Sequence, residues 1–278
     1  MRINTNVAAI NTLRVLAGTD QKIQRSIGRL SSGFRINRAA DDAAGLAIAN
    51  QLRADLGAMR QATRNAEQSS SLLQVAEGGA NGIQNILVRM KELGSQAISD
   101  NVDDAGRARI DIEFQELIAE IGRLSDSTEF AGVNLLDGTA AAALDFVVGA
   151  SSTPANDIIS VDVTAAVWDL STAGLGVAGT DMTDKVNANL AIVAVDAAIT
   201  SVSNLFAEIG AKANRIDIAL TQVRITAENT AAAESVIRDA DLAAEFTELT
   251  TQQILSQTGT SVLAQANQQA QSILSLLQ

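Results

Sequence analysis

The stretch RLSSGFRINRAADDAAGLAIAN, residues 29–50, decides how the chain is organised. A short basic amphipathic segment precedes it, and a helical pattern of about fifty residues follows it. Ser31-Ser32-Gly33 predicts the end of the first helix, because glycine readily adopts the left-handed conformation of a helix C-terminus. Residues 37–40 carry little apolar periodicity and indicate a connector. Asp41-Asp42 predicts the start of a second helix, because carboxylates accept hydrogen bonds from its free N–H groups and favour its dipole.

The composition favours helices that pack along thin seams. The 278 residues are 47% hydrophobic but only 3% aromatic, and the net charge of −12 argues against general nucleic-acid binding. Cysteine and histidine are both absent from the sequence, which excludes thiol nucleophiles, thiolate metal sites, disulfides and imidazole bases. We expect no cleaved Sec-type signal peptide and no membrane span, because we find neither a basic-then-apolar leader nor an apolar run of roughly 18 residues.

The first 38 residues carry seven positive side chains and one negative one, Asp20. Ile23, Ile27, Leu30 and Phe34 follow four-three-four spacing and therefore share one helical face. A membrane-surface helix, a nucleic-acid-binding arm and a transit peptide are alternatives for such a basic segment. The sequence lacks aromatic anchors and dense basic runs here, so we favour a helix that packs on a partner and leaves its basic residues solvated.

Three long helices follow from heptad-like spacing. A seam with small residues runs through residues 52–90, slips by one step near Ala76, and predicts a helix over 42–99, about 85 Å long. After a predicted turn at 100–106, a second seam at residues 110–124 indicates a helix over about 104–126. The strictest pattern, over 195–237, predicts a third helix from about Asp181. The fold class is therefore mainly α, an antiparallel coiled-coil-like helical rod.

Between residues 131 and 180 the helical periodicity gives way to short apolar runs, glycines and turn residues, which predict a short β and loop region. Leu144–Val148 and Ile158–Val163 are β-type runs joined by turn residues, and they indicate a small hairpin. Trp168, the single tryptophan, is interpreted as a local packing anchor.

Two charge features bear on function. Glu113, Glu116 and Glu120 could suggest a metal or acid–base site, but we favour a solvated flank balanced by Arg109 and Arg123. No charged side chain follows Glu248. Because an exposed helix normally carries charges, this last segment is predicted to meet protein on both faces, a polar tail being the alternative. Its apolar stripe contains Leu255, Val262, Ala266, Ala270, Ile273 and Leu277.

Several ordered strings resemble bacterial flagellins. They are Leu30–Asn37 with Ala39–Ile48, Ile3–Asn6 with Ala8-Ala9, Asn65-Ala66, Ser71–Gly78, Thr128–Gly138, Ile237–Glu245 and Ala264–Gln268. The resemblance spans both ends of the chain and all but roughly residues 139–185.

The resemblance implies a structural subunit that self-assembles into the flagellar filament for swimming motility, with no enzymatic activity and no cofactor or metal. Residues 1–44 with 238–278 would form an inner filament-core domain, and residues 45–237 a rod domain. The assembly seam of this inner domain would contain Ile23, Ile27, Leu30, Phe34, Leu255, Val262, Leu263, Ala266, Ile273 and Leu277. The hook–filament junction protein of the same family and a membrane-acting helical protein are the alternative functions.

The resemblance also implies partners and a location. The protein would be secreted to the extracellular filament without a cleaved signal peptide, and an export chaperone would hold its C-terminal segment. Filament cap and hook-junction proteins would contact it. The string Ile86–Leu93 resembles the patch that vertebrate Toll-like flagellin receptors read, with Arg89, Leu93 and Glu113 as matching residues. Neither nucleic acid nor a membrane is an expected partner.

Overall fold

The computed structural model describes residues 6–139, 142–149 and 157–275, with side chains up to Gln269. The chain divides into two compact units, one made of Met1–Leu56 with Glu228–Gln278 and the other of Gly57–Ala227. Helices α2 (Ala43–Ile98) and α5 (Lys185–Arg238) each contribute residues to both units. The domain boundaries expected from sequence fall at residues 44 and 238, and they stay a prediction.

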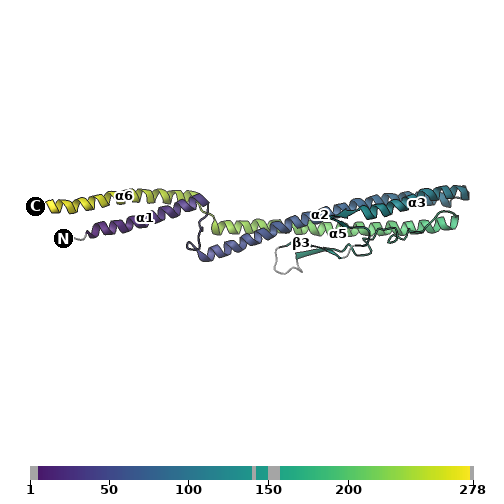
Figure 1. The fold of residues 1–278 in the computed structure, drawn as a ribbon, viewed down its shortest axis with the longest axis horizontal. Helices are drawn as coiled ribbons and strands as arrows, with labels where there is room; N and C mark the ends of the chain where they lie inside the picture. Colours follow the sequence, from purple (N-terminus) through teal and green to yellow (C-terminus); the bar gives the residue numbers. More distant parts are fainter. Residues whose placement is uncertain (1–5, 140–141, 150–156, 276–278) are drawn as a thin grey trace. The chain divides into compact units, whose positions relative to one another are not determined.

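The first unit pairs helix α1 (Val7–Ser32) with helix α6 (Leu242–Ser275). The two helices lie side by side and antiparallel (Figure 1), and the Asn6 side-chain amide donates to the Ala266 carbonyl at 3.1 Å. Gly33 ends α1 as predicted, since it has a φ of 74° and its N–H donates to the Arg29 carbonyl at 2.8 Å. Asp42 caps α2 as predicted, accepting from the Gly45 N–H at 2.9 Å.

The second unit is built from α2, α3 (Asp104–Ser127) and α5, which share one apolar core. Its fully buried members include Leu87 and Met90 from α2, Phe114 from α3, and Val195 from α5. Lys91 of α2 contacts Asp196 of α5 at 2.6 Å, and Glu67 of α2 contacts Arg224 of α5 at 2.9 Å. These pairings make α2 and α5 antiparallel, so the helical seams that the spacing predicted do close on one another.

Helix α3 begins at Asp104, as the sequence predicted, whereas helix α5 begins later than predicted. The turn expected at 100–106 is shorter, because Asp103 caps α3 by accepting from the Gly106 N–H at 2.8 Å. Helix α5 begins at Lys185 rather than near Asp181, because Asp184 accepts from the Asn187 N–H at 2.8 Å and is therefore the cap. Asp181 instead accepts from the Thr183 hydroxyl at 2.7 Å and belongs to a turn.

Two small hairpins lie between α3 and α5. Strands β3 (Leu144–Val147) and β4 (Ile158–Val161) pair antiparallel, which confirms the predicted hairpin, although residues 150–156 of its turn lie outside the described residues. A second pair, β1 (Glu129–Phe130) with β2 (Val133–Asn134), was not predicted, because two-residue strands show no alternation. Trp168 is fully buried in the core of this unit, in agreement with its predicted packing role.

One expectation about hydropathy is wrong. Helix α5 contains an 18-residue window with a mean hydropathy of 1.8 and few charges, so by length and composition it could cross a membrane. A core helix passes the same test, and one face of α5 lies in the shared core through Val195, Val202, Leu205 and Ile209. Only 28% of that window is buried in the fold, so core packing accounts for one face of α5 and leaves other apolar side chains of the helix exposed.

Candidate assembly surfaces

The α1–α6 pair covers only one narrow seam of each helix. Three of the 26 residues of α1 are buried, namely Ala9, Thr19 and Ser26. Gln252 is buried on α6. Large apolar side chains on both helices stay exposed; they are Val7, Ile10, Leu13, Val15 and Ile27 on α1, and Leu242, Phe246, Ile254, Leu255 and Val262 on α6. Among the side chains that the structure describes, the pair therefore leaves many large apolar groups open to solvent.

The pairing of α1 with α6 partly buries some residues of the predicted assembly seam and leaves others exposed. Five are half-buried, namely Ile23, Leu30, Phe34, Leu263 and Ala266. Ile27 is 51% exposed, Leu255 50% and Val262 45%. The side chains of Ile273 and Leu277 lie outside the described residues. The seam thus contributes partly to the α1–α6 contact and partly to an open surface.

An open apolar hollow of about 350 Å³ lies between α1 and α6. Its lining includes Val15 and Thr19 from α1 and Leu255, Gly259 and Val262 from α6. Gly259 keeps the hollow wide, because it adds no side chain where α1 is near; an added Cβ would lie 3.4 Å from the Leu16 side chain. The sequence stripe did not reveal this hollow, because a stripe says nothing of how closely two helices approach.

The two linkers that lead into α2 and out of α5 are bonded to each other. The Arg35 N–H donates to the Arg238 carbonyl at 2.7 Å, and the Ala240 N–H donates to the Gly33 carbonyl at 2.9 Å. Phe34 lies beneath the Arg238 guanidinium, 4.2 Å from the ring centre. Sequence reasoning missed this junction, since backbone pairing over a separation of some 200 residues leaves no local signal.

Ion pairs surround this junction at uneven distances. Arg53 reaches Glu234 at 3.1 Å, whereas Arg238 stands 3.8 Å from Glu234 and Arg29 stands 3.6 Å from Glu245. Two buried nitrogens of Arg238, Nε and Nη1, and one buried oxygen of Glu245, Oε1, have no hydrogen bond. The polar groups are thus gathered at the junction without full hydrogen bonding.

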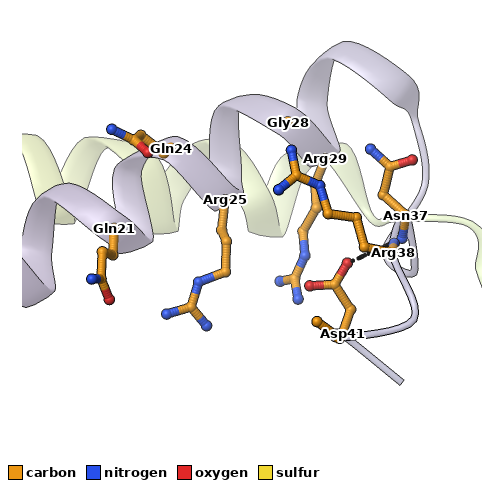
Figure 2. A pocket seen from close by; sticks show the side chains of 9 residues that line it. Gln21, Gln24, Arg25, Gly28, Arg29, Asn37, Arg38 and Asp41 are labelled. Atoms are coloured by element: carbon orange, nitrogen blue, oxygen red, sulfur yellow. Dashed lines mark hydrogen bonds between the residues drawn. The ribbon is translucent and has the colours of Figure 1, made fainter. Parts of the chain in front are cut away.

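A second hollow, of about 380 Å³, is polar and lies between the last turns of α1 and the linker after it. Figure 2 shows Arg25 and Arg29 projecting from α1 toward the side where Asp41 lies, with Arg38 coming from the linker. The hydrogen bond from the Arg38 N–H is the main cause that holds the pKa of Asp41 below its usual value; burial opposes it, while the Asn37 N–H and the charges of Arg29 and Arg38 act with it. The hollow therefore combines three guanidinium groups with one carboxylate.

The candidate receptor patch on the second unit is only partly at the surface. Arg89 is exposed and contacts Glu113 at 2.8 Å and Glu92 at 3.1 Å, and these hydrogen bonds raise the pKa of Arg89. Leu93 is only 2% exposed and packs in the core, so in this structure it offers no surface to a receptor. Residues four apart lie on the same side of a helix, but here Arg89 is exposed to solvent while Leu93 packs in the core that α2 shares with α3 and α5.

Glu113 and Glu120 of α3 each form an ion pair with a different arginine. Glu120 pairs with Arg123 at 2.6 Å, as predicted, whereas Glu113 pairs with Arg89 of α2 rather than with Arg109. Within the described ranges, no group of three or more acidic, histidine or cysteine residues could hold a metal ion.

Comparison with known families gives two matches that divide the chain. Residues 3–141 match the bacterial flagellin N-terminal helical region, and residues 192–277 match the bacterial flagellin C-terminal helical region. The resemblance inferred from the motifs is confirmed at both ends.

Similar proteins are found over the full length. A flagellin of Halalkalibacterium halodurans is 41% identical over 277 residues, and flagellin FlaB2 of Treponema pallidum is 38% identical over 287 residues; both chains are covered completely. A crystal structure of Bacillus cereus flagellin has a TM-score of 0.50 at 27% identity, covering 62% of this chain and 94% of that one. A putative hook-associated protein of Vibrio parahaemolyticus has a TM-score of 0.58 at 14% identity, covering 71% and 99%, and shares the fold.

These matches show that the chain is a structural protein of a family that self-assembles into filaments. The chain belongs to the bacterial flagellin family, and it is a structural subunit of the flagellar filament.

Proposed function

We propose that the two domains predicted from the sequence have different tasks in the filament. In this proposal residues 1–44 and 238–278, with α1 and α6, form the inner layer, and residues 45–237 form the surrounding rod. The observation that carries it is the set of large apolar side chains left exposed on both α1 and α6. Each subunit would bury these residues against its neighbours, and burial stabilises by roughly 25 cal/mol per Å² of apolar surface.

The charge pattern supports an inner position for α6. The 30 residues of the chain after Glu248, which include most of α6, contain no charged side chain, and their polar groups are neutral amides and hydroxyls. Neutral amides can satisfy one another in a crowded interior, whereas an unpaired buried charge costs several kcal/mol. A helix whose whole circumference is neutral is therefore suited to a place among other helices.

Electron microscopy of the purified chain tests this function. We expect seeded monomers to extend into filaments, and a chain shortened to residues 45–237 to form none. Filaments from the shortened chain would contradict an inner role for the two ends. Liposome co-sedimentation separates the alternative of a membrane-acting helix, and we expect no binding.

The free monomer is proposed to lack stable order at its two ends. The α1–α6 pair buries few residues, while ordering a chain costs about 1–2 kcal/mol per residue. Assembly would supply the missing burial, so that folding of the ends and addition of a subunit become one event.

Disordered ends would also suit export. We propose that the protein leaves the cell without a cleaved signal peptide and becomes part of the extracellular filament. An export chaperone would hold the C-terminal segment until then, and cap and hook-junction proteins would contact the subunit afterwards. A pull-down of the chaperone with the chain cut after Glu248 should lose the binding seen with the full chain.

Arg89 and Glu113 remain candidates for contact with a vertebrate Toll-like flagellin receptor. Both side chains are exposed and form an ion pair that crosses from α2 to α3, whereas Leu93 is buried. If the same surface also meets neighbouring subunits, monomers should signal more than filaments. A reporter-cell assay decides this: silent wild-type monomer, or full signalling by Arg89→Ala, would exclude the patch.

A further inference from the structure

The polar hollow beside the end of α1 holds more positive charge than its own chain neutralises. Neither the Arg25 nor the Arg38 guanidinium has a carboxylate oxygen within 4.0 Å in the part of the chain that the structure describes, and Arg29 reaches Glu245 only at 3.6 Å. The Asp41 carboxylate accepts from the Asn37 N–H at 3.2 Å and the Arg38 N–H at 3.0 Å. Both bonds go to Oδ2 and shape the linker, and the single negative charge of Asp41 is shared among three guanidinium groups.

The lining of the hollow is suited to carboxylate groups. Gln21, Gln24 and Asn37 add side-chain amides beside the three arginines, so the surface is rich in hydrogen-bond donors (Figure 2). A guanidinium presents a planar fork that matches the two oxygens of a carboxylate. A hollow of about 380 Å³ that is open to solvent has room for more than one such side chain.

The source of the carboxylates follows from the distribution of charge. The first 38 residues contain seven of the 20 lysines and arginines but one of the 32 acidic residues. The remaining chain is therefore strongly acidic. Glu116, Asp126 and Asp217 are exposed there, with no cation within 4.0 Å among the described residues. In a filament of identical chains, exposed carboxylates of this kind are present on every neighbouring copy.

We propose that the hollow lined by Arg25, Arg29 and Arg38 receives carboxylate side chains of a neighbouring copy in the filament. The inference rests on the proposed assembly of inner ends and deepens it. The contact would add ion pairs to the assembly surface of α1 and α6, whose other proposed contacts are apolar. It also links order at the end of α1 to the arrival of a neighbour, because the arginines gain their partners only then.

Critical concentrations for filament growth test the charge contact. The double variant Arg25→Gln, Arg38→Gln is compared with Arg14→Gln, Lys22→Gln, which removes the same charge from α1 outside the hollow. We expect the first variant to raise the critical concentration about 2- to 30-fold, as for two solvent-accessible ion pairs, and the control to change it little. Sodium chloride should weaken wild-type growth more than growth of the first variant, because screening acts on the contacts that the variant has lost.

Cross-linking identifies the partner. Arg25→Lys keeps the charge and supplies an amine that a carbodiimide can join to a carboxylate in contact with it. In filaments grown from mixed heavy and light isotope-labelled subunits, we expect cross-links from this position that join heavy to light peptides. Cross-links only within one copy, or none, would overturn the proposal. An unchanged critical concentration or an unchanged salt dependence in the double variant would do so as well. If the wild-type chain itself grows no filaments, the proposed function fails too, so the two failures are distinguishable.

Discussion

Neighbouring glycines in α2 offer a direct test of the packing in the second unit. A Cβ added at Gly79 would lie 2.5 Å from the Thr128 hydroxyl oxygen and 2.9 Å from a methyl carbon of Leu136. A Cβ added at Gly78 would meet nothing within 4 Å. The variants Gly79→Ala and Gly78→Ala therefore make the same chemical change one residue apart, once inside a contact and once in open space.

The neighbours of Gly79 have little freedom to withdraw. The Thr128 hydroxyl donates to the Leu124 carbonyl at 2.7 Å, and the Leu135 N–H donates to the Thr128 carbonyl at 3.0 Å. Leu136 is fully buried, and its carbonyl accepts from the Ser125 hydroxyl at 2.7 Å. An added methyl group must therefore displace a hydrogen-bonded turn, which is an overpacking effect of about 1–3 kcal/mol.

The two variants share one favourable effect. Alanine in place of glycine in a helix stabilises by about 1 kcal/mol, so Gly78→Ala should raise the free energy of unfolding by about that amount. The same gain is present at Gly79, and the difference between the variants isolates the steric effect. We expect Gly79→Ala to be less stable than Gly78→Ala by about 1–3 kcal/mol, a difference in Tm on the order of 2–12 °C.

Thermal and urea unfolding of monomers, followed by far-ultraviolet circular dichroism, measures this difference. Both variants should keep the helical content of the wild type at low temperature. If Gly79→Ala is as stable as Gly78→Ala, the turn at Thr128 and Leu136 does not pack against α2, and the close approach of these elements is refuted.

Three further predictions concern assembly, order and pH. Leu263→Asp and Ile273→Asp should abolish filament growth but leave monomer helicity intact, because each places an unpaired charge in the proposed interior. Leu263→Asn, whose side chain has the shape of aspartate without the charge, should reduce filament growth less. Normal filaments from either aspartate variant would refute burial of α6. Limited proteolysis of monomer should trim residues near 1–40 and beyond about 240, and protection of both ends would contradict their disorder. Hydrogen bonds from Thr183, and then from Asn187, hold the pKa of Asp181 below its ordinary 3.8 in the folded state. The ionised carboxylate therefore stabilises the folded protein above pH 3.8, and this stabilisation is lost as the pH falls through the lowered folded pKa. Urea midpoints measured from pH 6 to pH 3 should therefore fall less for Asp181→Asn, and equal slopes would show that this carboxylate does not contribute.

The long helical seams were predictable because their period repeats many times. Leu87, Met90, Phe114 and Val195 all follow the predicted spacing and are all fully buried. Each repeat adds independent evidence for the same face, so an error at one position, such as the slip near Ala76, does not change the assignment. The caps at Gly33 and Asp42 were equally readable, because they depend on residues within one turn of the helix end.

Contacts between distant segments were not predictable. The local rule paired Glu113 with Arg109, but the structure pairs it with Arg89, because a neighbouring helix presents its guanidinium at the same place. Glycine is a poor helix former, so Gly94 by itself weakens α2, yet an added Cβ there would lie 2.5 Å from Ile192 of α5. A sequence shows that a glycine is present, while the reason for it depends on which helix passes nearby and how closely.

The exposed apolar side chains of α5 and those of α6 differ in how many charged residues flank them. This difference indicates on how many sides each helix is contacted by partners. Val186, Leu190 and Val193 form an exposed stripe on α5, but charged residues flank it, including Lys185 and Asp196. Such a stripe can be covered on one side while its flanks stay in water. On α6 the exposed Ile254, Leu255 and Val262 have no charged neighbours on any face after Glu248. Water on one side of α6 would leave nothing charged to face it, so the composition of α6 favours partners all round, whereas that of α5 favours a contact on one face.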